Sequence, residues 1–253
     1  MERLRHVARA AGTPQRILVA ETADALLDVV DDHAGLVTAC RQMVQRQPTS
    51  APLVWLAANL LSVDEPYEVV WDLVAEMDGD PTDRELAHAL EPGMRVLTLG
   101  WPEMVTPGLA RRGDLTVSVL DGPVLARRIP DFDTGPIEAP LSGAAAALAR
   151  TDVVLSEAWA AGPESFLAPA GTTGVLAAAA HLGIDVWLVV PRGRALPTGL
   201  WNGLRRRLGA PSVEDDHEVV GADLVSAVVS PIGSTPLTEA IAAGGCPPAP
   251  ELQ

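Results

Sequence analysis

The chain contains no lysine, and all 18 of its basic residues are arginine. A lysine amine is needed for Schiff-base catalysis and for a Walker-type phosphate loop, so both are excluded. The sequence also lacks the GxGxxG, GxSxG and HExxH motifs. Standard dinucleotide-binding, serine-hydrolase and zinc-protease functions therefore have no support.

Cysteine is scarce as well, with only Cys40 and Cys246, which lie far apart. A structural zinc site needs four ligands in paired short spacings, and the five histidines are scattered without such spacing. We therefore expect a cytoplasmic protein with free thiols, no bound metal and no cofactor.

Positive charge is outnumbered: 33 acidic residues against 18 basic ones give a formal net charge of −15. This balance repels a nucleic-acid backbone overall, so we expect no direct nucleic-acid partner. Residues 1–11 are charged and are followed by no apolar run typical of a signal peptide, and no stretch approaches a membrane span. The lysine-free, acidic composition fits either a GC-rich genome or a saline cytoplasm.

The 253 residues are 48% hydrophobic, enough to bury the core of one large or two small domains. From Ile17 to about Leu90, apolar residues recur every three or four positions, which predicts consecutive helices. From Gly93 onwards, short apolar runs alternate with helical stretches, which predicts a parallel sheet. The expected strands are 94–98, 115–120, 151–155 and 184–190, and one last short helix and strand are expected over 219–229.

The alanine-rich segments 141–149 and 174–182 are expected to be helices, each directly before a strand. The predicted fold class is therefore α/β, with an N-terminal helical bundle (residues 1–92), a Rossmann-like parallel-sheet domain (93–243) and a loose tail (244–253).

The most specific chemical feature is an apolar strand that ends in Ser156 and Glu157, followed by Gly171, Thr172 and Thr173 at the start of a helix. Ligands of open parallel sheets bind beyond the carboxyl ends of the strands, and helix N-termini favour phosphate. A plain threonine cap would explain the same residues. Glu157 is a candidate general base or a partner of ligand hydroxyls, or else a solvated carboxylate.

A second junction between strand and helix runs through Leu99, Gly100 and Trp101, and Trp101 is more often a packing residue than a stacking platform. Separately, Arg205, Arg206 and Arg207 form a basic run that suits a phosphate or an acidic partner, and equally a solvated helix end.

Together these residues resemble the superfamily of the alpha, beta and delta subunits of initiation factor 2B, which also contains methylthioribose-1-phosphate and ribose-1,5-bisphosphate isomerases. The clearest similar stretch is 151–191, and 45–53, 96–98 and 222–229 follow the family order. The resemblance implies a helical domain and a Rossmann-like domain with a sugar-phosphate or nucleotide cleft between them, in a homo-oligomer of two or more chains. A role in translation initiation is implied only in this way.

The sequence departs from the isomerases where their chemistry resides. Gly100 stands at the place of the catalytic cysteine, Ala158 at that of the catalytic aspartate, and Gln47 at that of an arginine, with Arg46 one place upstream. The family's Asn-Lys pair is replaced by Pro169 and Ala170. Aldose-to-ketose isomerisation needs groups that move protons between adjacent carbons, so we expect this reaction to be absent.

The sequence leaves three functions open. The first is a non-catalytic sensor or assembly subunit that binds a phosphorylated small molecule. The second is a sugar-phosphate isomerase that uses Glu157 as a displaced acid or base, and the third is a structural subunit whose cleft is filled by Trp101. The segment between Leu120 and Leu141 also looks shorter than in the family. The candidate ligand-binding residues are Arg46, Gln47, Thr49, Thr98, Gly100, Ser156, Gly171, Thr172 and Thr173.

Overall fold

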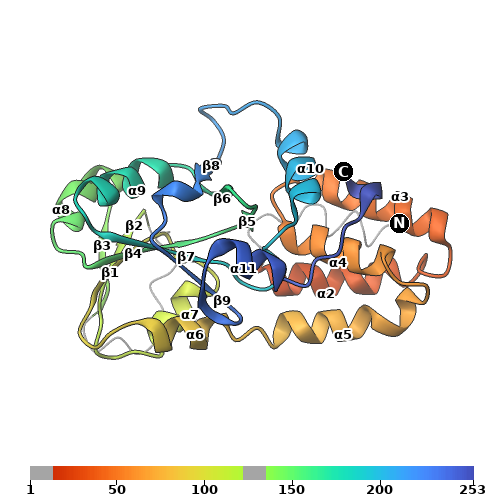
Figure 1. Cartoon of the computed structure of the whole chain (residues 1–253), viewed down its shortest axis with the longest axis horizontal. Helices are drawn as coiled ribbons and strands as arrows, with labels where there is room; N and C mark the ends of the chain where they lie inside the picture. Colours follow the sequence, from red (N-terminus) through yellow and green to blue (C-terminus); the bar gives the residue numbers. More distant parts are fainter. Residues whose placement is uncertain (1–13, 122–134) are drawn as a thin grey trace.

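The computed structural model describes residues 14–121 and 135–253. Most of the segment between Leu120 and Leu141, which the sequence predicts to be shorter than in the family, therefore lies outside the described residues. The first third of the chain is helical, as its periodicity predicts (Figure 1). The helices are α2 (Gln15–Leu26), α3 (His33–Arg46), α4 (Ala51–Leu61), α5 (Pro66–Asp78) and α6 (Thr82–Ala89).

Helix α4 is the centre of this helical layer. Pro52 in its first turn and Pro66 at the start of α5 set both helix starts, since proline's fixed φ suits the first turn. Nine of the eleven residues of α4 are buried, because α2, α3 and α5 surround it. A helix that is apolar on all sides needs such a covering.

The second part of the chain forms a seven-stranded sheet with the strand order β10-β9-β7-β4-β1-β2-β3. All neighbouring strands are parallel except the pair formed by β9 and β10. The strands are β1 (Arg95–Leu99), β2 (Thr116–Leu120), β3 (Ile137–Ala139), β4 (Val153–Glu157), β7 (Asp185–Val189), β9 (Ala227–Ser230) and β10 (Gly233–Thr235). The predicted α/β fold with a parallel sheet is thus confirmed.

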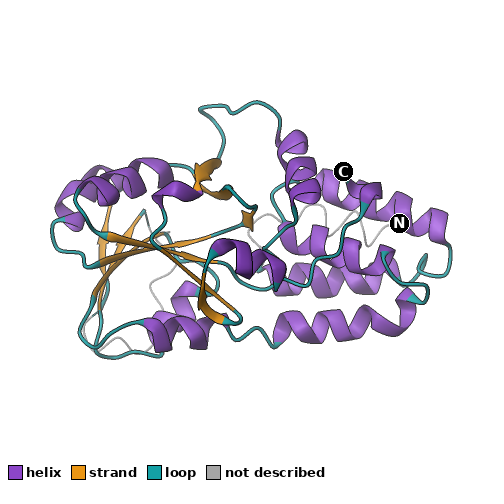
Figure 2. Cartoon of the chain, in the orientation of Figure 1, coloured by secondary structure: helices purple, strands orange, loops and turns teal. Residues whose placement is uncertain are grey.

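Helices cover both faces of the sheet (Figure 2). Alternate residues of each strand point to opposite faces, so Val154 packs in a cluster with α9 (Thr172–His181), whereas Val153 and Leu155 pack with α6 and α7 (Val105–Ala110). Helix α8 (Ala144–Leu148), preceded by a 3-10 turn at Leu141–Gly143, lies beside α9. Helix α11 (Leu237–Ala242) packs against β9.

A small antiparallel sheet lies beside the large one and consists of β5 (Ala160–Ala161), β6 (Ser165–Pro169) and β8 (His217–Gly221). The helix expected within 219–229 is only a 3-10 turn at Ala222–Leu224, and that segment begins as strand β8. The reason is that β8 finds a partner in β6, with Val220 buried in the core.

The end of the chain returns to the helical layer. In helix α10 (Thr198–Leu208), Leu200 and Trp201 join the same core as α3 and α4, and so does Leu252 in a final 3-10 turn at Pro250–Leu252. The indole of Trp55 donates a 3.1 Å hydrogen bond to the Gly245 carbonyl. The tail that the sequence predicts to be loose thus packs Leu252 into this core, because its prolines prevent a long helix but not burial of its apolar side chains.

The division of the chain at residues 92 and 243 stays a prediction, and the helical core draws on both sides of it. Across the described ranges, none of the helices combines the length and the apolar character needed to cross a membrane.

Candidate functional site

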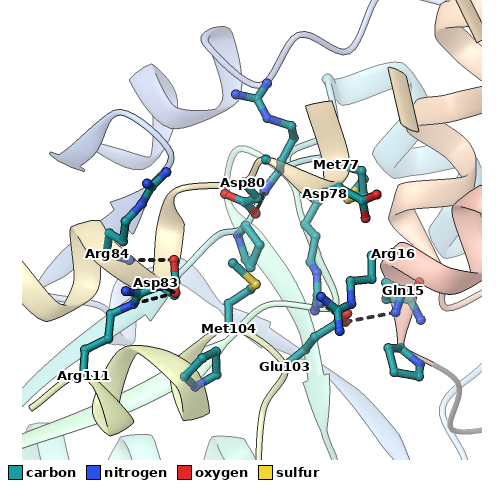
Figure 3. A pocket seen from close by; sticks show the side chains of 16 residues that line it. Gln15, Arg16, Met77, Asp78, Asp80, Asp83, Arg84, Glu103, Met104 and Arg111 are labelled. Carbon is teal, nitrogen blue, oxygen red and sulfur yellow. Dashed lines mark hydrogen bonds and ion pairs between the residues drawn. The ribbon is translucent and has the colours of Figure 1, made fainter. Parts of the chain in front are cut away.

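A cavity of about 650 Å³ lies between the carboxyl-end loops of the large sheet and the helical layer (Figure 3). The strand order reverses between β1 and β4, and ligands of open α/β sheets bind at such a switch point. The lining residues come from the start of α2, the turn between α5 and α6, the loop after β1 with α7, and the loop after β7. They are Pro14, Gln15, Arg16, Met77, Asp78, Gly79, Asp80, Asp83, Arg84, Glu103, Met104, Pro107, Arg111, Pro191, Arg192 and Arg194.

Among the residues that the structure describes, five arginines line this cavity, together with four carboxylates. The Nε of Arg111 donates to Asp83 at 2.7 Å, and Arg192 pairs with Glu76 at 3.2 Å. Within the described ranges, the exposed side chains of Arg16 and Arg84 form no ion pair. The cavity thus presents two guanidinium groups with no carboxylate partner.

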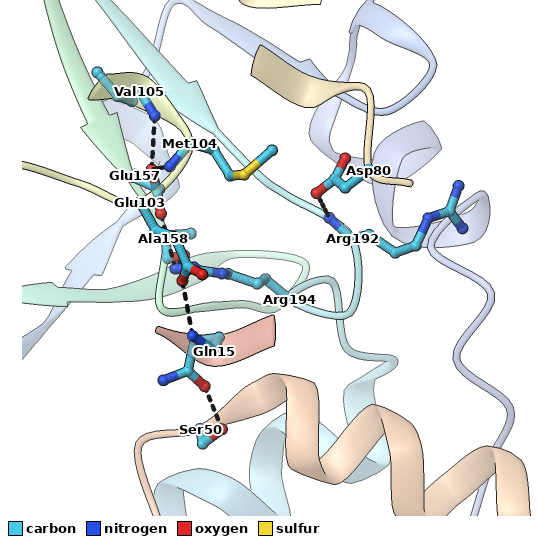
Figure 4. Close-up of polar contacts among 10 residues, drawn as sticks. All are labelled: Gln15, Ser50, Asp80, Glu103, Met104, Val105, Glu157, Ala158, Arg192 and Arg194. Carbon is cyan, nitrogen blue, oxygen red and sulfur yellow. Dashed lines mark hydrogen bonds and ion pairs between the residues drawn. The ribbon is translucent and has the colours of Figure 1, made fainter. Parts of the chain in front are cut away.

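Asp80 joins the helical layer to the sheet at the rim of the cavity (Figure 4). Its Oδ2 accepts the backbone N–H of Arg192 at 2.8 Å, and its Oδ1 accepts the backbone N–H and the hydroxyl of Thr82 at 3.0 and 2.5 Å. One carboxylate therefore fixes both the turn before α6 and the loop after β7.

Glu157 ends β4 opposite Val189 and is buried, with 3% of its side chain exposed. Its Oε2 accepts the backbone N–H groups of Met104 and Val105 at 2.7 and 2.9 Å, so it caps the start of α7. Its Oε1 pairs with Arg194 at 3.1 Å. Burial raises the pKa of Glu157, while Arg194 and the two N–H groups oppose that rise. Glu157 is therefore not a solvated carboxylate, and it lies behind Arg194 rather than in the lining of the cavity.

Arg194 connects this buried carboxylate to the cavity. Its guanidinium also donates to the Ala158 carbonyl at 2.9 Å and to Glu103 at 3.0 Å. Glu103 accepts the backbone N–H of Gln15 at 3.0 Å, and the Gln15 side chain accepts the hydroxyl of Ser50 at 2.5 Å (Figure 4). A continuous set of polar contacts thus runs from the end of β4 to the start of α4.

The residues at the start of α9 lie away from this cavity. Gly171 takes a positive φ of 93°, and the hydroxyl of Thr172 donates to the Pro169 carbonyl at 2.6 Å. The backbone N–H of Thr173 donates to the carboxylate of Glu218 at 2.6 Å. A phosphate at this helix end would have to displace the Glu218 carboxylate.

Two of the other candidates, Thr98 and Ser156, are buried on strands, and Gly100 follows β1 and is partly buried. Thr98 is fully buried and Ser156 is 4% exposed, while Gly100 has a positive φ of 62° and donates its N–H to the Leu120 carbonyl. Trp101 is partly buried against the core shared with α6 and α7 rather than in the cavity, so the cavity is not filled by this side chain.

Arg46, Gln47 and Thr49 lie at the end of α3 and in the turn before α4. They do not line the cavity, and their neighbour Ser50 reaches it through Gln15. A ligand-binding role for these three residues stays a prediction.

The residues predicted from the sequence did not include Arg194 and Glu103, nor Arg16 and Arg84. Arg194 follows the apolar strand that ends at Val189, so the strand-end rule that selected Glu157 selects it too. The other three lie on helices or in a loop whose approach to the sheet is set by tertiary packing.

The two cysteines, Cys40 and Cys246, are free, and burial raises the pKa of both thiols to about 12. Such thiols are poor nucleophiles at neutral pH. Among the described residues, no group of three or more His, Cys, Asp and Glu side chains is arranged to hold a metal ion.

No family model matches this sequence, and no curated protein matches it. Solved structures do resemble the chain. The translation initiation factor eIF-2B of Pyrococcus horikoshii OT3 superposes with a TM-score of 0.74 at 14% identity, over 95% of this chain and 98% of that one.

Two further structures each cover 95% of this chain at 15% identity. In the tetrameric eIF2B-beta2-delta2 complex of C. thermophilum, the match has a TM-score of 0.67 and spans 91% of the matched chain. The 5-methylthioribose 1-phosphate isomerase of Pyrococcus horikoshii OT3 gives a TM-score of 0.62 over 86% of its chain. This chain therefore has the fold that the initiation factor 2B subunits share with 5-methylthioribose 1-phosphate isomerase.

Proposed function

We propose that this chain is a non-catalytic relative of the initiation factor 2B subunits that binds a sugar phosphate or a nucleotide in the cavity at the sheet's carboxyl edge. In this proposal the chain acts within an oligomer, either as a sensor of the bound ligand or as a subunit needed for assembly. The observation that carries the proposal is the gathering of five arginines in one cavity of a chain with a net charge of −15.

The charges of the cavity suit a phosphorylated, hydroxyl-bearing ligand. Arg16 and Arg84 have no carboxylate partner among the described residues, and a guanidinium donates two parallel hydrogen bonds to a phosphate. The exposed carboxylate of Asp78 can accept hydrogen bonds from ligand hydroxyls. One cavity can therefore bind a phosphate group through its arginines and hydroxyl groups through a carboxylate.

The absence of isomerisation is supported by the contacts of Glu157. Both of its oxygens are engaged by protein groups, and it does not line the cavity. The described lining contains no histidine or cysteine. Moving a proton between adjacent carbons needs acid and base groups within hydrogen-bond reach of the substrate.

An isomerase is the second candidate, and the position of Glu157 favours it, because this carboxylate ends β4 at the carboxyl edge of the sheet and pairs with Arg194, which lines the cavity. In that case Arg194 would have to move aside to admit substrate. Loss of turnover in Glu157→Gln, with ligand binding retained, would establish this alternative in place of the sensor.

The proposal also includes a homo-oligomer of two or more chains. It is supported by the fold shared with a tetrameric complex of beta and delta subunits. Light scattering coupled to size exclusion would show a mass above that of the 26.5 kDa monomer. A monomer with and without ligand would contradict the oligomeric part.

Binding is tested by thermal shift with sugar phosphates, nucleoside monophosphates and inorganic phosphate, each also assayed for isomer formation. A ligand at about 100 times its Kd stabilises a protein by roughly 2.7 kcal/mol, which is readily measured. We expect stabilisation without turnover. Arg84→Gln should weaken binding by roughly tenfold or more, since charged hydrogen bonds contribute about 1.5–3 kcal/mol.

The matched control is Arg150→Gln, which removes an exposed arginine in the turn before β4, at the opposite end of that strand. Equal weakening by both variants would point to net charge rather than to this cavity. If none of the phosphorylated compounds stabilises the protein, the binding function is wrong.

A further inference from the structure

A second cavity, of about 500 Å³, lies between α3, α10 and the final 3-10 turn, on the helical layer. Three arginines line it: Arg41 from α3, and Arg206 and Arg207 from the end of α10. Glu251 contributes the single acidic side chain among its described lining residues. This concentration of positive charge is unexpected in a chain with a net charge of −15.

Two of these arginines are held in place by backbone carbonyls of the tail. The Nε of Arg41 donates to the carbonyl of Glu251 at 2.7 Å, and Arg207 donates to the carbonyl of Leu252 at 2.7 Å. These contacts use one nitrogen of each guanidinium, so the charged groups are positioned at the cavity without being neutralised. Ordered guanidinium groups lose less conformational entropy when they bind an anion.

Within the part of the chain that the structure describes, these arginines are not neutralised by an ion pair. Among residues 14–121 and 135–253, no carboxylate forms an ion pair with Arg41, Arg206 or Arg207. The Nε and one terminal nitrogen of Arg207 are buried with no hydrogen-bond partner. Burial lowers the pKa of Arg207, and the neighbouring charge of Arg206 lowers it further. A nearby anion favours the charged form of a guanidinium, so it would act against this lowering of the pKa.

The helix dipole explains only part of this pattern. Arg205, Arg206 and Arg207 lie in the last turn of α10, where positive charge is favourable. The dipole does not require that two of them share a cavity with Arg41 from another helix. Arg205 and Arg206 both line a further cavity at this helix end, but of these two only Arg206 also lines the second cavity. Arg205 is therefore an internal reference for charge at the same helix end.

We propose that this second cavity is a binding site for the phosphate group of a small organic phosphate. Arg206 and Arg41 donate to the phosphate oxygens, and Gln45, which also lines the cavity, supplies an amide donor. The volume lies within the range of small-molecule sites. The inference is independent of the proposed function, because the two cavities share none of their described lining residues.

The test is an NMR titration of the full chain with glycerol 3-phosphate, with inorganic phosphate and succinate as parallel probes. The amide signals of Gly203 and Gln253 report on the second cavity, and those of Asp80 and Arg192 report on the first. We expect glycerol 3-phosphate to shift the Gly203 and Gln253 signals in a saturable way. Arg206→Gln should weaken this binding at least tenfold, whereas Arg205→Gln and Arg84→Gln should leave it within twofold.

Three results would overturn the inference. The first is an absence of saturable shifts at Gly203 and Gln253. The second is equal weakening by Arg205→Gln and Arg206→Gln, which would reduce the effect to general charge. The third is equal or tighter binding of inorganic phosphate or succinate, which would show a site for any small anion. If Arg84→Gln abolishes the shifts of Asp80 and Arg192 but keeps those of Gly203 and Gln253, binding at the first cavity has failed while binding at the second cavity is supported.

Discussion

The guanidinium of Arg194 and the carboxylate of Glu157 form an ion pair at 3.1 Å with 5% and 3% of their side chains exposed. Glu157 ends β4, and Arg194 lies in the loop after β7, so the pair closes the carboxyl edge of the sheet beneath the cavity. Each partner has further hydrogen bonds, which offset part of the cost of removing both charges from water.

Replacing Arg194 with methionine should be strongly destabilising. The substitution leaves the Glu157 carboxylate buried without its cation, which typically costs about 3–5 kcal/mol. Urea unfolding at pH 7, followed by far-UV circular dichroism, measures the free energy of unfolding. The double variant Arg194→Met, Glu157→Met should recover part of the loss, since it removes both charges. If the free energy of unfolding of Arg194→Met lay within about 1 kcal/mol of the parent value, the ion pair would not contribute as described.

Replacing Glu218 with alanine should weaken the start of α9. The carboxylate accepts the Thr173 N–H at 2.6 Å, and loss of a helix N-terminal acceptor costs about 0.5–2 kcal/mol. The control is Glu214→Ala, an exposed acidic residue in the preceding loop. The two variants are compared by the guanidinium chloride concentration at the midpoint of unfolding. Identical midpoints would mean that Glu218 does not cap the helix.

Two glycines should respond to alanine in opposite directions. A Cβ at Gly162 would lie 2.3 Å from the Trp201 ring, so Gly162→Ala overpacks the interface with α10 and should cost about 1–3 kcal/mol. A Cβ at Gly174, in the first turns of α9, meets no atom within 4 Å. Gly174→Ala should therefore stabilise by about 0.5–1 kcal/mol. Thermal unfolding of both variants checks the signs, and a shift of the same sign in both would contradict this account.

The pair formed by Asp152 and Arg95 should give a measurable pH dependence. Hydrogen bonds from Arg95 hold the pKa of Asp152 at about 2, below its ordinary value of 3.8. A lowered folded-state pKa contributes stability that is present above pH 3.8 and lost as the pH falls through about 2. In Asp152→Asn, the free energy of unfolding should therefore depend less steeply on pH in that window.

The control for this pH experiment is Asp185→Asn, which removes an exposed carboxylate at the start of β7 with the same change in net charge. Urea unfolding at a series of acidic pH values provides the slopes. A slope for Asp152→Asn that equals that of the parent would show that the contact does not act in solution.

Local patterns were enough to predict the helices of the first third and the parallel strands β1, β2, β4 and β7. The three- and four-residue spacing from Ile17 and the short apolar runs from Gly93 reflect contacts within one element, so they appear in any short window of sequence. The packing of the tail does not follow from any short window of sequence. The burial of Leu252 depends on α3 and α10, which are far away along the chain.

The sequence by itself determined that no lysine is available for chemistry, that a parallel sheet follows a helical bundle, and that Glu157 ends a strand at the sheet's carboxyl edge. Only the tertiary structure decided the electrostatic partner of each charged group. It buried Glu157 against Arg194, placed Glu218 at the start of α9, and left Arg84 without a carboxylate among the described residues. The physical reason is that burial and ion pairing depend on distances between segments remote in sequence, and those distances exist only once the two layers have packed.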